Sequence, residues 1–169
     1  KIAALALFTR VLLEPFASAI SQWQQVVIFV SLASMLVGAL GAIAQTNIKR
    51  LLAYSSIGHV GFMLMALAAG NQSGVQAMLI YLSVYIFMSV GMFGAVLLMK
   101  RDGKSLENIK ELSGLSQTNP LLAIVISICI FSMAGIPPMA GFFGKMYVVF
   151  AAIEGGLTWL AVVGVCTSV

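Results

Sequence analysis

The chain has 169 residues, of which 61% are hydrophobic and only 8% are charged, and it carries a formal net charge of +4. Its mean hydropathy is +1.07, and a soluble domain of this length cannot hide so much apolar surface in its own core. The chain is therefore expected to lie in lipid. Its expected fold class is all-α, a polytopic bundle of transmembrane helices, because a helix satisfies its own backbone hydrogen bonds there.

Apolar runs define the expected spans. A helix needs about 20 apolar residues to cross a bilayer core of about 30 Å. Runs of sufficient length occupy residues 22–44, 51–69, 75–99 and 121–153. Residues 1–13 and 157–169 are apolar but shorter, and each is expected to be a span cut partway. Because no initiator Met or signal peptide opens the chain, we expect one membrane domain, residues 1–169, that is incomplete at both ends.

The basic residues gather in two of the loops between these runs, namely Lys49 with Arg50, and Lys100, Arg101, Lys104 and Lys110. If the runs alternate across the membrane, both loops face the same side, which the positive-inside rule places in the cytoplasm or the matrix. Topology thus accounts for the positive charge, and no nucleic acid is expected as a partner. In the second loop, residues 105–115 are expected to form a short amphipathic helix on the membrane surface.

Small and polar residues recur along one face of the run 22–44, at spacings of three and four: Ser31, Ser34, Gly38, Gly41 and Gln45. In lipid, helices gain little by burying leucine, and close backbone approach at Gly and Ser is what holds a bundle together. This face is therefore expected to pack against another helix.

The next two runs also carry polar stripes. These are Tyr54, Ser55 and His59 in the first, and Tyr81, Tyr85 and Ser89 in the second. Polar stripes on successive helices have two interpretations. They can simply pack the helices together, or they can line a hydrated path, since hydroxyl and imidazole groups hold water where lipid cannot.

The run 121–153 contains Pro137 and Pro138 near its middle. As one straight helix, the run would reach about 50 Å, which is too long for an untilted span. The two prolines lack N–H groups and leave the carbonyls of Met133 and Ala134 without helical partners. We expect a broken helix here, enclosed by protein or facing water. A simple packing kink is the alternative.

Two ionisable residues are expected at membrane depth. Lys145 follows the break among aromatic and aliphatic residues, where a central lysine costs about 2.5–3.5 kcal/mol to insert. His59, the only histidine, lies near the middle of the run 51–69. Both are candidate proton-transfer residues. The alternatives are a lysine that extends to the membrane interface and a structural histidine bonded to a neighbouring carbonyl.

The stretch Asn47-Ile-Lys-Arg-Leu-Leu-Ala-Tyr-Ser-Ser-Ile-Gly-His59 resembles a segment shared by the antiporter-like membrane subunits of respiratory complex I. The stretch from Phe131 to Lys145, FSMAGIPPMAGFFGK, resembles the broken helix of the branch called subunit N in bacteria and subunit 2 in mitochondria, where a lysine follows a Gly-Phe-x-Gly element. The resemblance covers essentially the whole chain. It implies the second inverted repeat of an antiporter-like fold with fourteen helices, from about helix 8 to helix 13.

The resemblance also implies residue roles. Lys1 matches a lysine of helix 8 and Lys145 the lysine of helix 12. The implied half-channel runs from Lys1, through water at His59, to Lys145 and the other side of the membrane. The residues alone leave Lys1 equally well explained as an ordinary boundary lysine. Tyr81 to Ser89 depart from the other antiporter-like subunits, which carry histidines and a lysine there, and this departure favours the subunit N branch.

The function that the resemblance implies is proton translocation across a bacterial plasma membrane or a mitochondrial inner membrane, coupled to electron transfer from NADH to quinone. No thiolate cluster or Gly-rich phosphate cradle is present in the sequence, so no cofactor or metal is expected in this chain. Flavin, iron–sulfur clusters and quinone would belong to partner membrane and peripheral-arm subunits. Two alternatives stay open: a subunit of a multi-subunit cation/proton antiporter or membrane-bound hydrogenase, and a purely structural membrane spacer.

Overall fold

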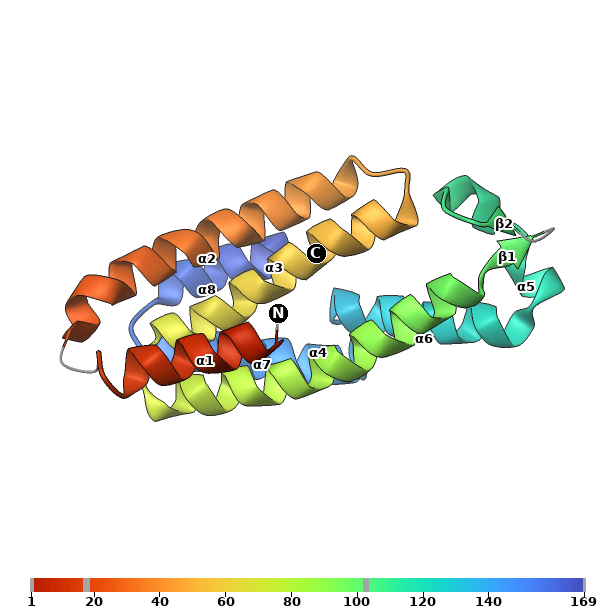
Figure 1. Cartoon of the computed structure of the whole chain (residues 1–169). Helices are drawn as coiled ribbons and strands as arrows, with labels where there is room; N and C mark the ends of the chain where they lie inside the picture. The colour runs from red at the N-terminus through yellow and green to blue at the C-terminus, as the bar shows by residue number, and fades with distance from the viewer. Residues whose placement is uncertain (1, 17–18, 102–103, 169) are drawn as a thin grey trace.

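The computed structural model describes residues 2–16, 19–101 and 104–168, and most of that length is helical. Three helices are long and apolar enough to cross a membrane: α2 (Ile20–Ile43), α3 (Ile48–Ala68) and α4 (Gln72–Leu98). Within the described residues, three shorter apolar helices, α1 (Ile2–Leu13), α6 (Pro120–Ala134) and α8 (Thr158–Thr167), accompany them, together with α7 (Ala140–Glu154). The expected all-α membrane fold is confirmed (Figure 1).

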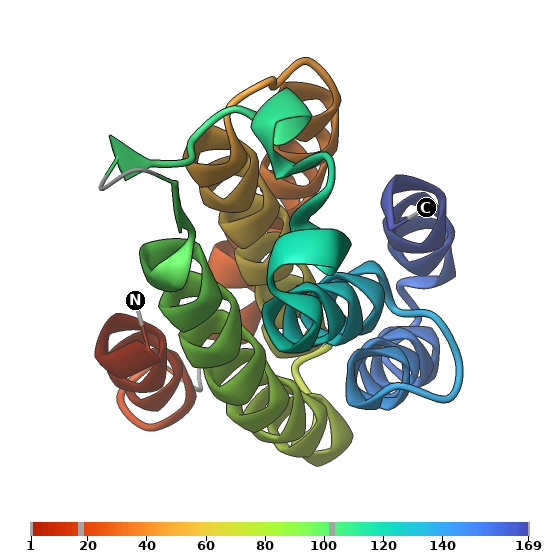
Figure 2. The same cartoon turned by 90° about the vertical axis from the view of Figure 1, so that its right-hand side faces the viewer.

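Helix α3 lies at the centre of the bundle. It forms an antiparallel hairpin with α2, and its other sides contact α4, α7 and α8. Helices α6 and α7 pack along α4, and α8 lies against α2 and α7. The end-on view shows the two terminal helices, α1 and α8, on opposite flanks (Figure 2). Any group carried by the inner face of α3 is therefore enclosed by protein.

Two asparagines start the long helices earlier than the apolar runs suggest. Asn47 Oδ1 accepts the N–H groups of Lys49 at 2.9 Å and Arg50 at 3.3 Å, and Asn71 Oδ1 accepts that of Gly74 at 2.7 Å. An asparagine N-cap satisfies the otherwise unpaired donors of the first turn. The helices therefore begin at Ile48 and Gln72, inside segments that the sequence assigns to polar loops.

The small-residue face of α2 packs on α3 as expected. A Cβ atom at Gly38 would lie 2.5 Å from the backbone nitrogen of Gly58, so the two backbones are nearly in contact there. Ser31, completely buried, donates its hydroxyl hydrogen bond to the carbonyl of Gly61 at 2.8 Å. Close approach at small residues and one interhelical hydrogen bond thus hold the hairpin.

The broken helix is also confirmed. Helix α6 ends at Ala134, Gly135 adopts a left-handed conformation with φ of 86°, and α7 begins at Ala140. The N–H of Gly135 donates to the carbonyl of Phe131, a C-terminal capping bond that glycine favours. Pro137 and Pro138 lie in the intervening turn, joined by a cis peptide bond. The run 121–153 is therefore two helices with a change of direction between them.

The hydrophilic segment after α4 contains short elements only. Strands β1 (Lys100–Arg101) and β2 (Lys104–Ser105) pair antiparallel, and they are followed by the 3-10 helix η2 (Ile109–Leu112) and by α5 (Leu115–Thr118). The prediction of one amphipathic helix over residues 105–115 is wrong. Asn108 and Glu111 form a capping box that starts a helical turn at Ile109. Gly114, with φ of 81°, prevents this turn from continuing as a helix.

This segment is fastened to the start of α3. The N–H of Ile48 donates to the carbonyl of Glu107, and the N–H of Ile109 donates to that of Thr46, each at 2.9 Å. These two bonds join the loop between α2 and α3 to the loop between α4 and α6. The expectation that the two basic loops share one side is confirmed.

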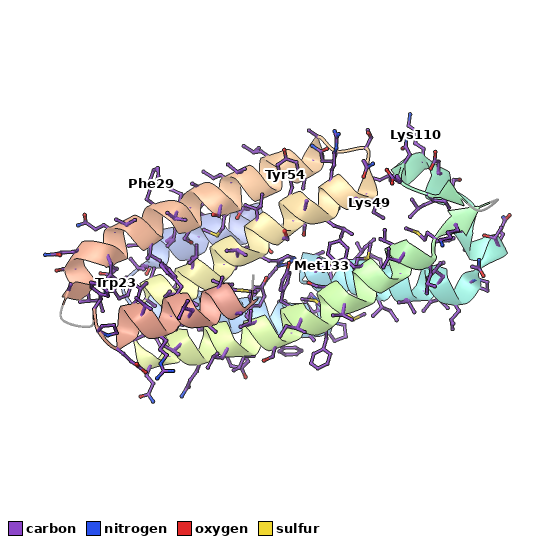
Figure 3. The ribbon with its side chains drawn as sticks, in the orientation of Figure 1. Trp23, Phe29, Lys49, Tyr54, Lys110 and Met133 are labelled. Carbon is purple, nitrogen blue, oxygen red and sulfur yellow. The ribbon has the colours of Figure 1, made fainter. Side chains whose placement is uncertain are left out.

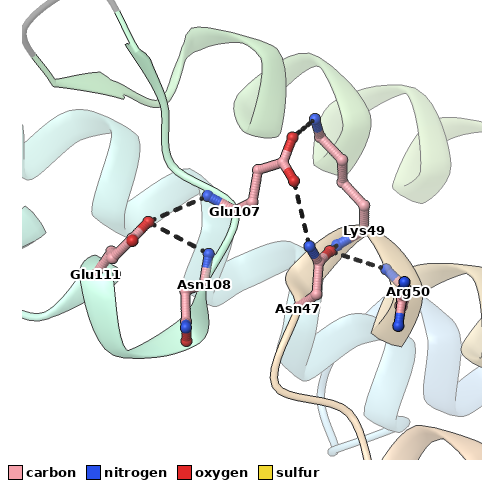
Figure 4. Close-up of polar contacts among 6 residues, drawn as sticks. All are labelled: Asn47, Lys49, Arg50, Glu107, Asn108 and Glu111. Atoms are coloured by element: carbon pink, nitrogen blue, oxygen red, sulfur yellow. Dashed lines mark hydrogen bonds and ion pairs between the residues drawn. The ribbon is translucent and has the colours of Figure 1, made fainter.

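Side chains reinforce the same junction. Lys49 Nζ and Asn47 Nδ2 donate to the two carboxylate oxygens of Glu107, at 2.5 Å and 3.3 Å (Figure 4). The hydrogen bond from Lys49, followed by that from Asn47, holds the pKa of Glu107 below its ordinary value. We call the contact of Asn47 and Lys49 with Glu107 the loop clamp.

The bundle exposes large apolar residues and buries a few polar residues within a mainly apolar core. Phe87, Leu121 and Phe29 expose 79%, 78% and 70% of their surface, and Phe29 points away from α2 in Figure 3. Ser31, Ser56, His59 and Ser132 are buried. A water-soluble protein does not expose such a surface, whereas lipid solvates it and leaves polar groups to pair inside the bundle.

Candidate functional site

A pocket of about 400 Å³ lies between α2, α3, α6, α7 and the end of α8. Most of its wall is apolar and includes Met133, which sits in the middle of the bundle in Figure 3. Its polar side chains come from α3 and, far later in the sequence, from α7 and the end of α8: Ser55, His59, Lys145, Thr167 and Ser168. The structure thus brings the two predicted proton-transfer residues that it describes, His59 and Lys145, to one pocket.

Lys145 extends back toward the helix break. Its Nζ donates to the carbonyl of Ala134 at 2.9 Å and to the hydroxyl of Ser168 at 2.7 Å, and it lies 5.5 Å from the centre of the Phe62 ring. Helical side chains lean toward the N-terminus of their helix, which directs this lysine to the break and away from the end of α7 at Glu154. The sequence predicts that the Ala134 carbonyl lacks a helical partner. In the structure, Lys145 donates a hydrogen bond to this carbonyl instead.

The break creates this lysine site. The last carbonyls of a helix are unpaired and carry partial negative charge, and a cation placed there is stabilised. Gly135 leaves room for the lysine, because a Cβ atom at that position would lie 3.0 Å from Lys145 Cδ. Ser132 Oγ accepts the N–H of Gly141 at 3.2 Å and so ties the end of α6 to the start of α7. The chain therefore fixes both the acceptor and the lysine that reaches it.

His59 is held by two tyrosines of α4. Its Nδ1 and the hydroxyl of Tyr81 lie 2.7 Å apart, a hydrogen bond whose direction follows the ring tautomer. The ring of Tyr85 packs against the imidazole with a centroid distance of 5.1 Å. His59 and Tyr85 are buried, and Tyr81 is completely so. The alternative of a histidine bonded to a backbone carbonyl does not describe this ring, since the hydrogen bond at Nδ1 joins it to a hydroxyl.

The remaining predicted residues occupy different places. Ser55 lines the pocket. Ser89 has a buried hydroxyl oxygen without a hydrogen-bond partner among the described residues. Tyr54 packs its ring on Gly41, at the contact between α2 and α3. Lys1 lies outside the described residues.

Sequence reasoning missed Thr167 and Ser168 at the end of α8 and the role of Gly135 beside Lys145. The two hydroxyl residues stand at the end of an apolar run that was interpreted only as part of a span. Their polarity is a signal visible in the sequence. That Ser168 lies beside Lys145 is not, because this contact depends on how α8 folds back. In the same way, the sequence shows a glycine at position 135. That the Lys145 side chain rests against it depends on how α7 packs beside the end of α6.

The pocket combines a lysine ammonium, an imidazole and hydroxyl groups within an apolar wall. These groups give up and accept protons, and the volume accommodates the water needed to connect them. Among the described residues, no three His, Cys, Asp or Glu side chains gather in a way that would hold a metal ion. The chemistry available here is proton exchange.

The fold and the pocket define a class: polytopic helical membrane proteins in which a broken helix presents a lysine to a mostly apolar pocket between the helices. The whole chain, residues 1–169, matches the family described as "NADH:quinone oxidoreductase/Mrp antiporter, TM", and the chain belongs to that family.

Among curated relatives, the chain is 55% identical over its whole length to the NADH-quinone oxidoreductase subunits N of Paramagnetospirillum magneticum and Rhodospirillum rubrum. It covers 35% of the length of each of those proteins, so it spans about a third of its relatives.

Solved structures show the same fold. The Mrp complex from Dietzia sp. DQ12-45-1b matches 99% of the chain with a TM-score of 0.90 and 29% identity, over 31% of that structure's chain. Respiratory complex I from Thermus thermophilus matches 85% of the chain with a TM-score of 0.73 and 35% identity, over 32% of its chain. The antiporter-like fold predicted for the chain is therefore confirmed.

Proposed function

We propose that this chain translocates protons across an energy-transducing membrane as part of an NADH:quinone oxidoreductase. The observation that carries the proposal is the pocket shared by Lys145 and His59 beside the broken helix. It is supported by the match to subunit N relatives over the whole chain. The membrane is a bacterial plasma membrane or a mitochondrial inner membrane, and the loop-clamp side faces the cytoplasm or the matrix.

In this function, Lys145 and His59 exchange a proton through pocket water. An ammonium that gives a proton to water leaves a neutral amine, whose bonds to Ala134 and Ser168 then change strength, because a charged donor makes the stronger hydrogen bond. Electron transfer takes place in partner membrane and peripheral-arm subunits, which hold the flavin, iron–sulfur clusters and quinone. This chain contributes proton-transfer groups and no redox centre.

Replacement of Lys145 by Met in the complete complex tests the proposal. Proton pumping into membrane vesicles and NADH oxidation are measured together, with complex content determined on native gels. We expect pumping to fall at least about tenfold, since a positioned acid–base group contributes about 10²–10⁴-fold. Lys110→Met is the matched control, because Lys110 is an exposed lysine of η2 at the far end of the bundle. Normal pumping by Lys145→Met would remove this lysine from the proton path.

A second function is favoured by one comparison. The Mrp complex matches nearly the whole chain, with the TM-score of 0.90, which suits a subunit of a multi-subunit cation/proton antiporter. Purification of the native assembly separates the two proposals. Flavin and iron–sulfur subunits accompany the chain in an NADH:quinone oxidoreductase and are absent from an assembly that works only as an antiporter. If pumping and ion exchange both survive Lys145→Met in the assembly that is recovered, Lys145 is not in the proton path, and a structural spacer becomes the better explanation of this chain.

A further inference from the structure

Tyr81 contacts both helices that carry the candidate proton-transfer residues. Its hydroxyl lies 2.7 Å from Nδ1 of His59 on α3. Its ring rests on Gly144 of α7, where an added Cβ atom would lie 2.5 Å from Tyr81 Cδ2. Gly144 directly precedes Lys145. The side chain is completely buried, so its position is set by α3 and α7 together.

The partner of one imidazole nitrogen decides what the other nitrogen can do. With Nδ1 bonded to Tyr81, Nε2 is the ring nitrogen left to the pocket that His59 shares with Lys145. A tyrosine hydroxyl is a neutral group that both donates and accepts hydrogen bonds. A carboxylate in its place would attract the charged imidazolium and hold its proton, whereas the hydroxyl orients the ring without trapping the charge.

We propose that Tyr81 is a positioning residue for proton transfer at His59, and this inference rests on the proposed function. The Nδ1–H group of the ring donates to the Tyr81 hydroxyl, and Nε2 carries the lone pair. A proton that leaves the Lys145 ammonium through water adds to Nε2, which gives an imidazolium and a neutral lysine amine. The imidazolium later releases that same Nε2 proton to water in the pocket. The Nδ1 atom keeps its hydrogen throughout.

The contact with Gly144 ties this orientation to the position of α7. Helix α7 begins at the break, so it is the element best able to move relative to α6. When α7 shifts, the glycine surface under the Tyr81 ring shifts with it, and the hydroxyl changes its reach to His59. The proton state of Lys145 and the orientation of His59 are thereby connected through one buried side chain.

Tyr85 is the matched control on the same helix. It is buried, it lies one turn from Tyr81, and its ring also contacts the imidazole, at 5.1 Å between centroids. The hydrogen bond to the ring, however, is made by Tyr81. Tyr81→Phe and Tyr85→Phe each remove one hydroxyl from the same surroundings, and only the first removes the group that holds Nδ1.

The experiment measures the ratio of proton pumping to NADH oxidation in membrane vesicles that contain the complete complex. We expect Tyr81→Phe to lower the ratio about threefold to tenfold, the range for loss of one hydrogen bond, and Tyr85→Phe, which keeps the ring contact with His59, to lower it less. The pH profile of the ratio should move only in Tyr81→Phe. The titratable groups around His59 in the described helices are Tyr81 and Tyr85 from α4 and Lys145 from α7.

Gly144→Ala provides a second route that keeps the hydroxyl. Its methyl group pushes on the Tyr81 ring, so it should lower the ratio as Tyr81→Phe does, whereas Gly94→Ala on α4 meets open space and should not. This variant decides the matter if Tyr81→Phe fails to assemble.

Equal ratios in Tyr81→Phe and Tyr85→Phe, or a normal ratio in Gly144→Ala, would overturn the inference. Lys145→Met distinguishes the two levels: if it pumps normally, the proposed function fails, and if only the tyrosine and glycine variants are normal, the inference on Tyr81 fails alone.

Discussion

At the residue scale, the lysine site depends on a glycine that no other residue replaces easily. Gly135 ends α6 with φ of 86°, a left-handed conformation that costs an L-residue about 1–2 kcal/mol. It also faces the side chain of Lys145. The backbone turn and the room for the lysine are therefore two separate demands on one position.

Gly135→Ala is expected to disturb both. Its Cβ would lie 3.0 Å from Lys145 Cδ and 3.2 Å from Nζ, so the lysine side chain, which donates to the Ala134 carbonyl, must give way by a few tenths of an ångström. Gly114 has nearly the same φ, 81°, with nothing within 4 Å of an added Cβ. Gly114→Ala should therefore lower thermal stability by a similar amount while pumping remains normal. Pumping measured beside the melting temperature checks this, and equal pumping by the two variants would show that the turn alone matters.

The sequence predicts the residues of the site better than their partners. Two prolines without N–H groups make a helix break unavoidable, and a lysine shortly after them is conspicuous in an apolar run. That Lys145 bonds Ser168 follows only once α8 returns beside α7, a contact with no local signal. Tyr81 was recognised as polar and on the correct helix face, but its bond to His59 depends on how α3 and α4 pack.

At the scale of elements, the hairpin of α2 and α3 holds the histidine in place. Gly38 and Gly58 let the two backbones touch beside His59, which directly follows Gly58, and Met35 and Gly38 also line the lysine pocket. The register of this hairpin therefore sets one wall of the pocket. Its strength comes from close backbone approach, since lipid competes for any leucine contact.

Gly38→Ala should weaken the hairpin. The new methyl group would lie 2.5 Å from Gly58 N and 2.7 Å from Gly58 Cα, and backbone atoms cannot rotate away as a side chain does. A loss of about 1–3 kcal/mol is expected for such overpacking. Gly94→Ala, with open space around it, should be neutral or stabilising, because alanine is the better helix former. Thermal melting of the purified complex compares the two, and a Gly38 variant as stable as the Gly94 variant would mean that the helices separate freely.

At the scale of the whole molecule, the loop clamp joins two loops that lie on the same side of the bundle. It connects the hairpin of α2 and α3 with the segment that leads from α4 to the broken helix. Its hydrogen bonds lie outside the spans, in water, where they hold the hairpin and the broken helix in one arrangement. The clamp thus connects the start of α3 with the segment that leads to α6.

The clamp should respond to acid through Glu107. Because its hydrogen bonds lower its pKa in the folded protein, its stabilising contribution is complete above the ordinary carboxyl pKa and is lost as the pH falls through the lowered folded value. Hydrogen–deuterium exchange at Ile48 and Ile109, which donate to the facing loop, reports the opening. Glu107→Gln should speed exchange at neutral pH, and the difference from wild type should vanish in acid. Glu154→Gln, an exposed carboxylate at the end of α7, should leave both amides protected. A Glu107 variant that keeps wild-type protection at neutral pH would show that the two backbone hydrogen bonds hold the loops without the ion pair.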